Sequence, residues 1–194
     1  MRTLLAAFAL VLVPLSASAA FHLWQITEVY SNADGSVQFV ELEMCPSAVT
    51  CNNEHFLSGQ MITSNSTVYS FPNDLPAGTA GHHFLIATPA FASQTGAVPP
   101  DYTFAAANFM STDADTINFA SGVNMFIYNV GALPTDGVNS LHEPYGSNVR
   151  TTAPNSPTNF AGQVGPEPAG WLGILAGSIT VFGLAHRRGW SDRR

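Results

Sequence analysis

The chain has 194 residues, a formal net charge of −7 and no lysine, and 46% of its residues are hydrophobic. Residues 21–165 contain eleven acidic residues against a single base, Arg150, which gives this part a formal charge of −10. The negative electrostatic potential of such a surface repels nucleic acid and anionic glycans and favours cations, so nucleic-acid binding is excluded as a function. The same segment is long enough for one domain with a sizeable core.

The first twenty residues have the pattern of a secretory signal peptide. Arg2 precedes an apolar run over 4–15, and the small residues of 16–20 are typical of a cleavage site. We expect cleavage after Ala19 or Ala20 and export of the remainder. The alternative interpretation is an N-terminal anchor that is retained.

A β-hairpin is predicted at the start of the exported part. Residues 24–30 and 37–44 alternate between apolar and polar side chains, as half-buried strands do. Between them, Asp34-Gly35 supplies the positive φ that a tight reversal needs. The two stretches together are the strongest hairpin signal in the chain.

Two cysteines, Cys45 and Cys51, follow this hairpin with five residues between them. In an oxidising compartment a pair so close in sequence most often forms a disulfide that closes a small loop. A metal site is the alternative, for which only His55 is a nearby ligand of the right kind. We therefore predict the disulfide.

The rest of the exported part has short β-rich stretches separated by Pro, Gly, Asn and Asp. The breakers recur every eight to twelve residues and no helix-length period is present, which predicts an all-β sandwich over residues 21–145. A buried central strand is expected at 83–88, a last edge strand at 138–141, and a flexible stalk rich in Pro, Asn and Thr at 146–165. The other expected elements are strands at or within 55–62, 67–71, 102–104, 115–119 and 124–128, and one helical turn at 89–92.

Six short stretches between residues 26 and 160 form a recognisable series: Ile26–Asn32, Gln38–Leu42, Leu57–Gly59, Phe84–Thr88, Pro100–Tyr102 and Asn155–Phe160. Through them, residues 26–160 resemble a bacterial lamin-tail-like family of exported β-sandwich domains. This resemblance implies an immunoglobulin-like sandwich in a surface or envelope setting, and it implies no reaction, because such folds host many functions.

Three aspartates, Asp101, Asp113 and Asp115, are candidate Ca²⁺ ligands, because hard oxygen ligands at alternating positions suit that ion. The spacing of an EF-hand loop is absent. The alternative is a turn whose aspartate side chains accept hydrogen bonds from their own backbone. A second set of residues with the same chemistry is Glu28, Asn32 and Asp34.

Histidines and paired carboxylates give two further hypotheses. His82, His83 and His55 are candidate ligands for a transition metal, but His82 and His83 point to opposite faces if they lie on a strand, so these two do not easily share one ion. Glu41 and Glu43 share one strand face, which is the geometry of a glycosidase site. No second wall is predicted opposite them, so we interpret them as solvated, and no Gly-x-Ser-x-Gly elbow occurs.

The C-terminal residues combine three ordered parts. Pro166-Glu167-Pro168 precedes 17 uncharged residues over 169–185, and the basic pair Arg187-Arg188 follows. A helix of this length covers roughly 26 Å, at the short end of what spans a bilayer core. The arginines would hold that end in the cytoplasm. The alternative is an apolar core helix.

This order of parts resembles the PEP-CTERM sorting signal of Gram-negative bacteria. The resemblance implies recognition by an exosortase, a tethered intermediate at the inner membrane, and delivery to the cell surface or extracellular matrix. We therefore expect a non-enzymatic protein with a structural or adhesive role in the exopolysaccharide layer. The alternatives are a carbohydrate- or calcium-binding module and, third, a secreted hydrolase.

Overall fold

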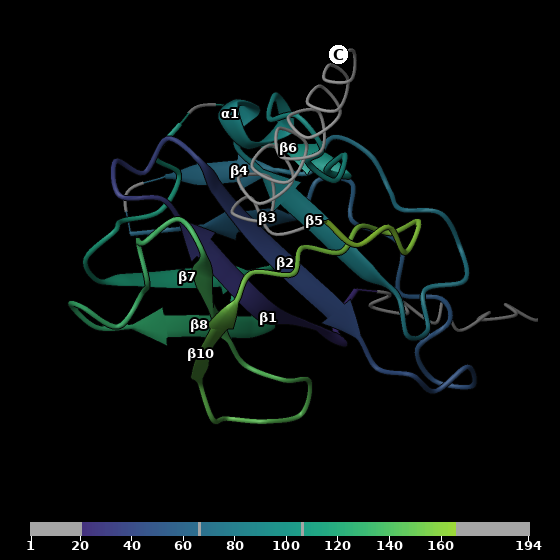
Figure 1. Cartoon of the computed structure of the whole chain (residues 1–194). Helices are drawn as coiled ribbons and strands as arrows, with labels where there is room; N and C mark the ends of the chain where they lie inside the picture. Colours follow the sequence, from purple (N-terminus) through teal and green to yellow (C-terminus); the bar gives the residue numbers. More distant parts are fainter. Residues whose placement is uncertain (1–20, 66, 106, 166–194) are drawn as a thin grey trace, which may run out of the picture.

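The computed structural model describes residues 21–65, 67–105 and 107–165, which form two β-sheets and one short helix (Figure 1). The fold is therefore all-β, as predicted. The expected signal peptide (1–20) and the expected sorting signal with its membrane span (166–194) lie outside the described residues. In the part of the chain that is described, no helix has the length and hydropathy needed to cross a membrane.

The larger sheet has six strands in the order β10-β9-β1-β2-β5-β6, and the smaller has four in the order β4-β3-β7-β8. Neighbouring strands are antiparallel except β5 and β6, which are parallel. The larger sheet consists of β1 (Trp24–Ser31), β2 (Gln38–Met44), β5 (His83–Ala87), β6 (Tyr102–Thr103), β9 (Asn139–His142) and β10 (Thr151–Pro154). The smaller consists of β3 (Met61–Thr63), β4 (Val68–Ser70), β7 (Asp115–Phe119) and β8 (Asn124–Tyr128).

The hairpin predicted over 24–44 is confirmed as β1–β2. The sequence also predicts a second hairpin, from strands at 115–119 and 124–128 around Ala120-Ser121-Gly122, and this is confirmed as β7–β8. Gly35, in the first turn, has a φ of 72°, which a residue with a side chain rarely adopts. The ladder between β1 and β2 shifts register between Ile26 and Glu28, so Thr27 is an extra residue in β1. The shift brings Glu28 directly opposite Glu41.

Aromatic side chains fill the space between the sheets. The ring of Phe84, on the buried strand β5, lies at centroid distances of 4.7 Å from Trp24, 5.9 Å from Phe71 and 6.3 Å from Phe119. All four rings are at most 1% exposed. The indole nitrogen of Trp24 donates to the backbone oxygen of Glu54 at 2.6 Å, so its one polar group is satisfied inside the core.

A second, smaller apolar cluster lies on the outer face of the larger sheet, beneath α1 (Pro89–Ala92). Phe39 of β2 stacks on Tyr30 of β1 at 5.2 Å and meets Phe91 of α1 edge to face at 5.4 Å. Thr88 caps the helix, and its hydroxyl accepts a bond from the backbone N–H of Phe91. The helix therefore covers the outer face of the larger sheet at this end.

The C-terminal part differs from the prediction of a stalk at 146–165. Residues Thr151–Pro154 form β10, which pairs with β9, so the expected last strand lies inside the sheet instead of at its edge. Residues 155–165, which we call the crossing segment, then run over the outer face of β2 and β5 (Figure 1). Composition alone indicates a linker here, because β10 exposes most of its side chains and has no apolar alternation.

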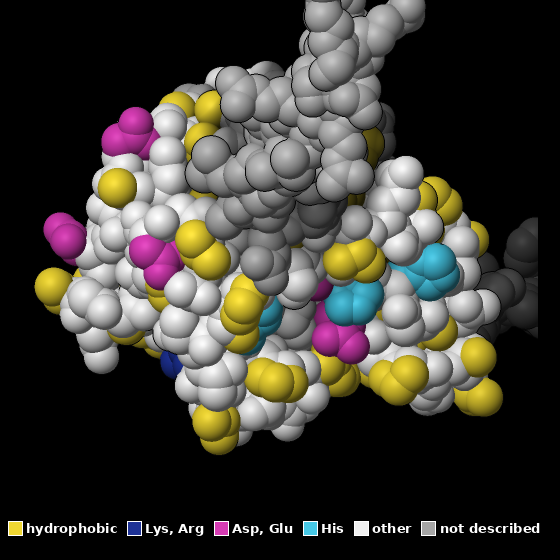
Figure 2. All heavy atoms as spheres, in the orientation of Figure 1, with side chains coloured by type: hydrophobic (Ala, Val, Ile, Leu, Met, Phe, Trp, Pro, Cys, Tyr) yellow, Lys and Arg dark blue, Asp and Glu magenta, His cyan; other side chains and the backbone are white. Residues whose placement is uncertain are grey.

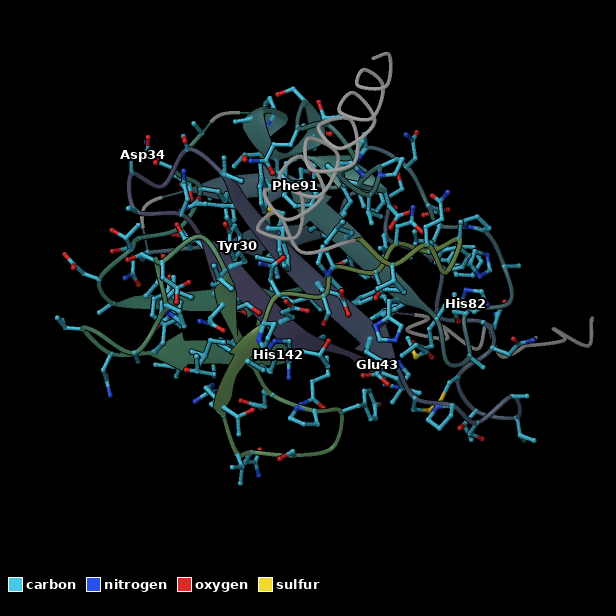
Figure 3. The ribbon with its side chains drawn as sticks, viewed as in Figure 1. Tyr30, Asp34, Glu43, His82, Phe91 and His142 are labelled. Atoms are coloured by element: carbon cyan, nitrogen blue, oxygen red, sulfur yellow. A yellow bond between two sulfur atoms is a disulfide. The ribbon has the colours of Figure 1, made fainter. Side chains whose placement is uncertain are left out.

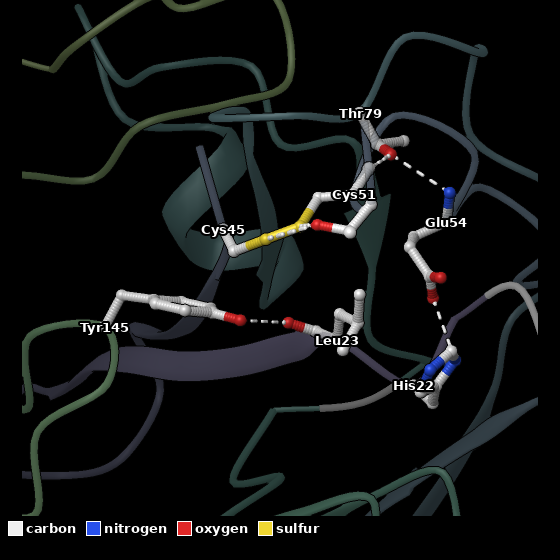
Figure 4. The surroundings of a disulfide bond; sticks show 8 residues. His22, Leu23, Cys45, Cys51, Glu54, Thr79 and Tyr145 are labelled. Atoms are coloured by element: carbon white, nitrogen blue, oxygen red, sulfur yellow. Dashed lines mark hydrogen bonds and ion pairs between the residues drawn. A yellow bond between two sulfur atoms is a disulfide. The ribbon is translucent and has the colours of Figure 1, made fainter. Parts of the chain in front are cut away.

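The predicted disulfide between Cys45 and Cys51 is present, with a Cα–Cα distance of 5.9 Å (Figure 4). The hydroxyl of Thr79 fixes the end of this loop. It donates to the carbonyl of Cys51 at 2.5 Å and accepts from the backbone N–H of Glu54 at 3.1 Å. The loop is therefore attached to the segment that precedes β5.

Replacing both cysteines with serine is expected to lower the unfolding free energy by about 2 kcal/mol, because a short cross-linked loop restricts the unfolded chain. Urea unfolding of the oxidised protein, the reduced protein and the double variant measures this effect. The reduced protein and the double variant should agree. A double variant as stable as the oxidised protein would contradict the assignment of a stabilising role to the disulfide.

Candidate functional site

The outer face of the larger sheet is apolar beneath α1 and acidic further along the same strands. Alternation places Glu28 on the same face as Tyr30 in β1, and Glu41 and Glu43 on the same face as Phe39 in β2. The prediction that Glu41 and Glu43 share one strand face is thus confirmed. Figure 3 labels Tyr30 and Phe91 in the apolar part and Glu43 and His142 in the polar part.

The crossing segment is held to this face by three carboxylates, an arrangement that we call the carboxylate clamp. Backbone N–H groups at every second residue of the segment donate to three acids, one in β1, one in β2 and one directly before β6. Bonds from N–H to an ionised carboxylate are about twice as strong as neutral ones. The three pairs are Ser156 to Glu28 (2.9 Å), Thr158 to Glu41 (2.5 Å) and Phe160 to Asp101 (2.9 Å).

Further contacts hold the end of the crossing segment. The ring of His82 stacks on that of Phe160 at 4.6 Å, and Nδ1 of His82 donates to the Phe160 carbonyl at 2.9 Å. The backbone N–H of Gly165 donates to the carbonyl of Pro157 at 3.0 Å, which closes the segment on itself. The described chain therefore ends on the sandwich.

Beside the clamp, the surface is hollowed into a pocket of about 270 Å³. Figure 2 shows histidine and acidic side chains next to one another on this face of the molecule. The pocket lies over β1, β2, β5 and β9, with the crossing segment as its wall. Its polar side chains are those of Thr27, Glu28, Glu41, Glu43, His83 and His142, joined by Ser156 and Thr158.

Glu41 is at the centre of this pocket and is only 4% exposed. Nδ1 of His83 donates to its Oε1 at 2.7 Å, while the Thr158 N–H occupies its Oε2. Burial raises the pKa of the Glu41 carboxyl, and the charge of Glu28 adds to this, although the bond from His83 acts against it. The prediction that Glu41 is solvated is wrong, because the crossing segment provides the second wall.

His83 has a pKa above its ordinary value. Burial alone would lower the pKa of this imidazole, but its hydrogen bond to Glu41 and the charges of Glu41, Glu43 and Glu28 outweigh burial. A proton held between a half-buried imidazole and a buried carboxyl in a pocket is typical of functional sites, and ion pairs with a structural role produce it as well. Here the pair also fixes the wall of the pocket.

Glu28 is held in the same way on the other side of Glu41. Its Oε1 accepts from the Ser140 hydroxyl at 2.6 Å and lies 3.6 Å from Nε2 of His142. Its Oε2 accepts from the Ser156 hydroxyl at 3.2 Å. Glu28 thus connects β1, β9 and the crossing segment.

The unfolding free energy is expected to fall as pH rises above about 6.5, the ordinary pKa of histidine. A histidine whose pKa is higher in the folded than in the unfolded protein stabilises the folded state fully at pH values below its unfolded-state pKa. This stabilisation is lost as the pH rises through its folded-state pKa. The raised pKa values of Glu41 and Asp101 act in the same direction at lower pH, because their folded forms retain protons that the unfolded chain has lost. The other titratable groups facing His83 and Glu41 across the pocket are Glu28, Glu43 and His142.

Urea unfolding between pH 6 and 9 checks this expectation. The variant His83→Gln, which keeps a donor but cannot titrate, should show a flatter dependence than the natural protein over the same range. A rise in stability with pH, or an identical slope in the variant, would contradict the part assigned to His83.

The three predicted calcium ligands are not brought together. Asp101 lies directly before β6, where its Oδ2 accepts from the N–H groups of Leu85 at 2.8 Å and Phe160. Asp115 begins β7 in the smaller sheet and is 2% exposed, whereas Asp113 is exposed. Among the described residues, no three His, Cys, Asp or Glu side chains are placed to hold one metal ion.

The remaining predicted ligands have separate partners. Asp34 accepts from the N–H and the hydroxyl of Ser36, as the turn interpretation expects, whereas Glu28 accepts from the hydroxyls of Ser140 and Ser156. His82 and His83 contact Phe160 and Glu41 respectively, so they share no partner. The ring of His55 packs against that of Phe56 in a tilted arrangement, with 4.0 Å between the centroids. Sequence reasoning missed His142 as a pocket residue, since its place depends on the pairing of β9 with β1.

The fold and the pocket together define an all-β protein of two sheets with an acidic, histidine-containing pocket over the larger one. Comparison with protein-family models and with curated proteins gives no match for this chain.

Proposed function

We propose that this chain is an exported, non-enzymatic protein with an immunoglobulin-like sandwich, directed by a C-terminal PEP-type signal to the surface or matrix of a Gram-negative bacterium. An exosortase would be its sorting partner, and the inner membrane its temporary site. Its role is structural or adhesive, within the exopolysaccharide layer.

The observation that supports this proposal most is the position of the carboxylate clamp. Three carboxylates hold residues 155–165 to the larger sheet, directly before the proposed signal at Pro166-Glu167-Pro168. A protein held by its C-terminal end receives any pulling force at this point. The clamp passes that force into β1, β2 and the start of β6, as a tethered surface domain requires. The disulfide is also consistent with an oxidising compartment.

The hydrogen bonds that the buried acids make within the protein favour a structural role over hydrolysis. A general acid or base needs a carboxyl within reach of a substrate proton. In Glu41 both oxygens have partners inside the protein, and in Glu28 both oxygens accept from the sandwich or the crossing segment. A binding module is the second candidate, because the pocket beside these acids is open and contains Glu43, which lies outside the clamp.

Sorting is tested in a producing strain that contains an exosortase. The triple variant Pro166→Ala, Glu167→Gln and Pro168→Ala should accumulate in the inner membrane and be lost from the cell surface. The variant Trp190→Ala, beyond the arginine pair, serves as the control. Surface delivery of the triple variant at the natural level would refute the sorting proposal.

A further inference from the structure

Two polar side chains in the pocket have no part in the clamp. Thr27, the extra residue of β1, is 6% exposed and lines the pocket, and its buried hydroxyl has no hydrogen-bond partner. A buried hydroxyl without a partner is costly and uncommon in folded proteins, so it is expected to meet a ligand or water. The carboxylate of Glu43 accepts no hydrogen bond from the described residues and is partly exposed at the same pocket.

The pocket also carries an excess of negative charge. Three glutamates and two histidines line it, and no arginine does. Within the described residues the only Lys or Arg is Arg150, which pairs with Glu143 at 2.7 Å and lies over the ring of Phe126. Arg150 is therefore bound outside the pocket. A cation from outside the protein would balance the negative charge of the pocket.

The size of the pocket and the spacing of its groups narrow the class of cation. A bare metal ion needs several ligands converging at short distances, and the described His and Glu side chains do not converge in this way. A volume of about 270 Å³ is below the range of roughly 300–1,000 Å³ typical of drug-sized ligands. It fits one six-membered ring. A ring that carries an ammonium group and hydroxyls would satisfy both the acids and Thr27.

We propose that this pocket binds one amino-sugar unit, with its ammonium group at Glu43 and a ring hydroxyl at Thr27. The inference rests on the proposed surface function, since the sugar would be a unit of a surrounding polysaccharide. The glutamates of the clamp supply the negative field, while Glu43 makes the direct contact.

Calorimetry of the full chain in detergent micelles, with glucosamine and N-acetylglucosamine as probes, tests this proposal. The acetyl group removes the charge and keeps the ring, so glucosamine should bind at least about tenfold more tightly, as the loss of one charge-assisted contact predicts. The variant Glu43→Gln should weaken glucosamine binding by about tenfold. Thr27→Val, which has nearly the same shape, should weaken it severalfold.

The control Asp113→Asn removes the same charge from an exposed site in the loop before β7 of the smaller sheet and should leave glucosamine binding unchanged. Equal affinity for the two sugars, no heat with either, or binding of Ca²⁺ in place of glucosamine would overturn the proposal. These results are independent of sorting. A protein that binds glucosamine but ignores the proline signal would refute only the sorting proposal, and one that is sorted but binds neither sugar would refute only the site.

Discussion

Replacing Asp115 with alanine is expected to lower the unfolding free energy by about 3–5 kcal/mol, among the largest effects of any single change. Its carboxylate accepts from the Ser64 hydroxyl and from the backbone N–H groups of Asn65, Ser111 and Thr116, at 2.7–2.8 Å. Alanine leaves these donors without an acceptor in a site that is almost fully buried. Urea unfolding measures the loss.

Asp113, two residues earlier, provides the matched control. Its side chain is exposed, so Asp113→Ala should change the unfolding free energy by no more than about 0.5 kcal/mol. Both aspartates were equivalent candidates for calcium, and only the structure separates them. If calcium instead bridged them, both variants would lose stability and a chelator would destabilise the natural protein. That result would contradict the structural part given to Asp115.

Replacing Phe84 with alanine is expected to cost about 3–5 kcal/mol, because it empties the middle of the aromatic core. The ring has no exposed surface and touches rings from both sheets, including Trp24 and Phe119. The surrounding rings are large and rigid, so they close the cavity poorly. Thermal or urea unfolding checks this value.

Phe56→Ala is the control for the loss of an aromatic ring. Phe56 is 48% exposed and its ring packs at a tilt against that of His55, so the same substitution should cost less than about 1 kcal/mol. Equal losses at the two positions would show that Phe84 does not occupy the core position described above.

Local pattern was enough to predict the two hairpins and the buried strand β5. In each hairpin the alternation of side chains is clear within the strands, and a glycine-containing turn lies between them. The strand β10 has no such signal. Its residues are largely exposed, and its position depends on hydrogen bonds to β9, so the composition of 146–165 indicated a linker.

The candidate site was predicted only in part, for a related reason. The shared face of Glu41 and Glu43 follows from strand geometry. The burial of Glu41 does not, because the covering residue, Thr158, is 117 positions away in the sequence. The crossing segment binds through alternate backbone N–H groups, which every residue except proline has, so its side chains carry no periodic signal. What the sequence does offer is a set of acids on β-strands without basic partners.

The intact mass of the mature protein, isolated from a producing strain that contains an exosortase, tests the central claim of export and tail-directed sorting most directly. We predict an N-terminus created by cleavage after Ala19 or Ala20 and a C-terminus that is cut or modified near Pro166-Glu167-Pro168. A soluble chain with the mass of the unprocessed residues 1–194 would contradict it.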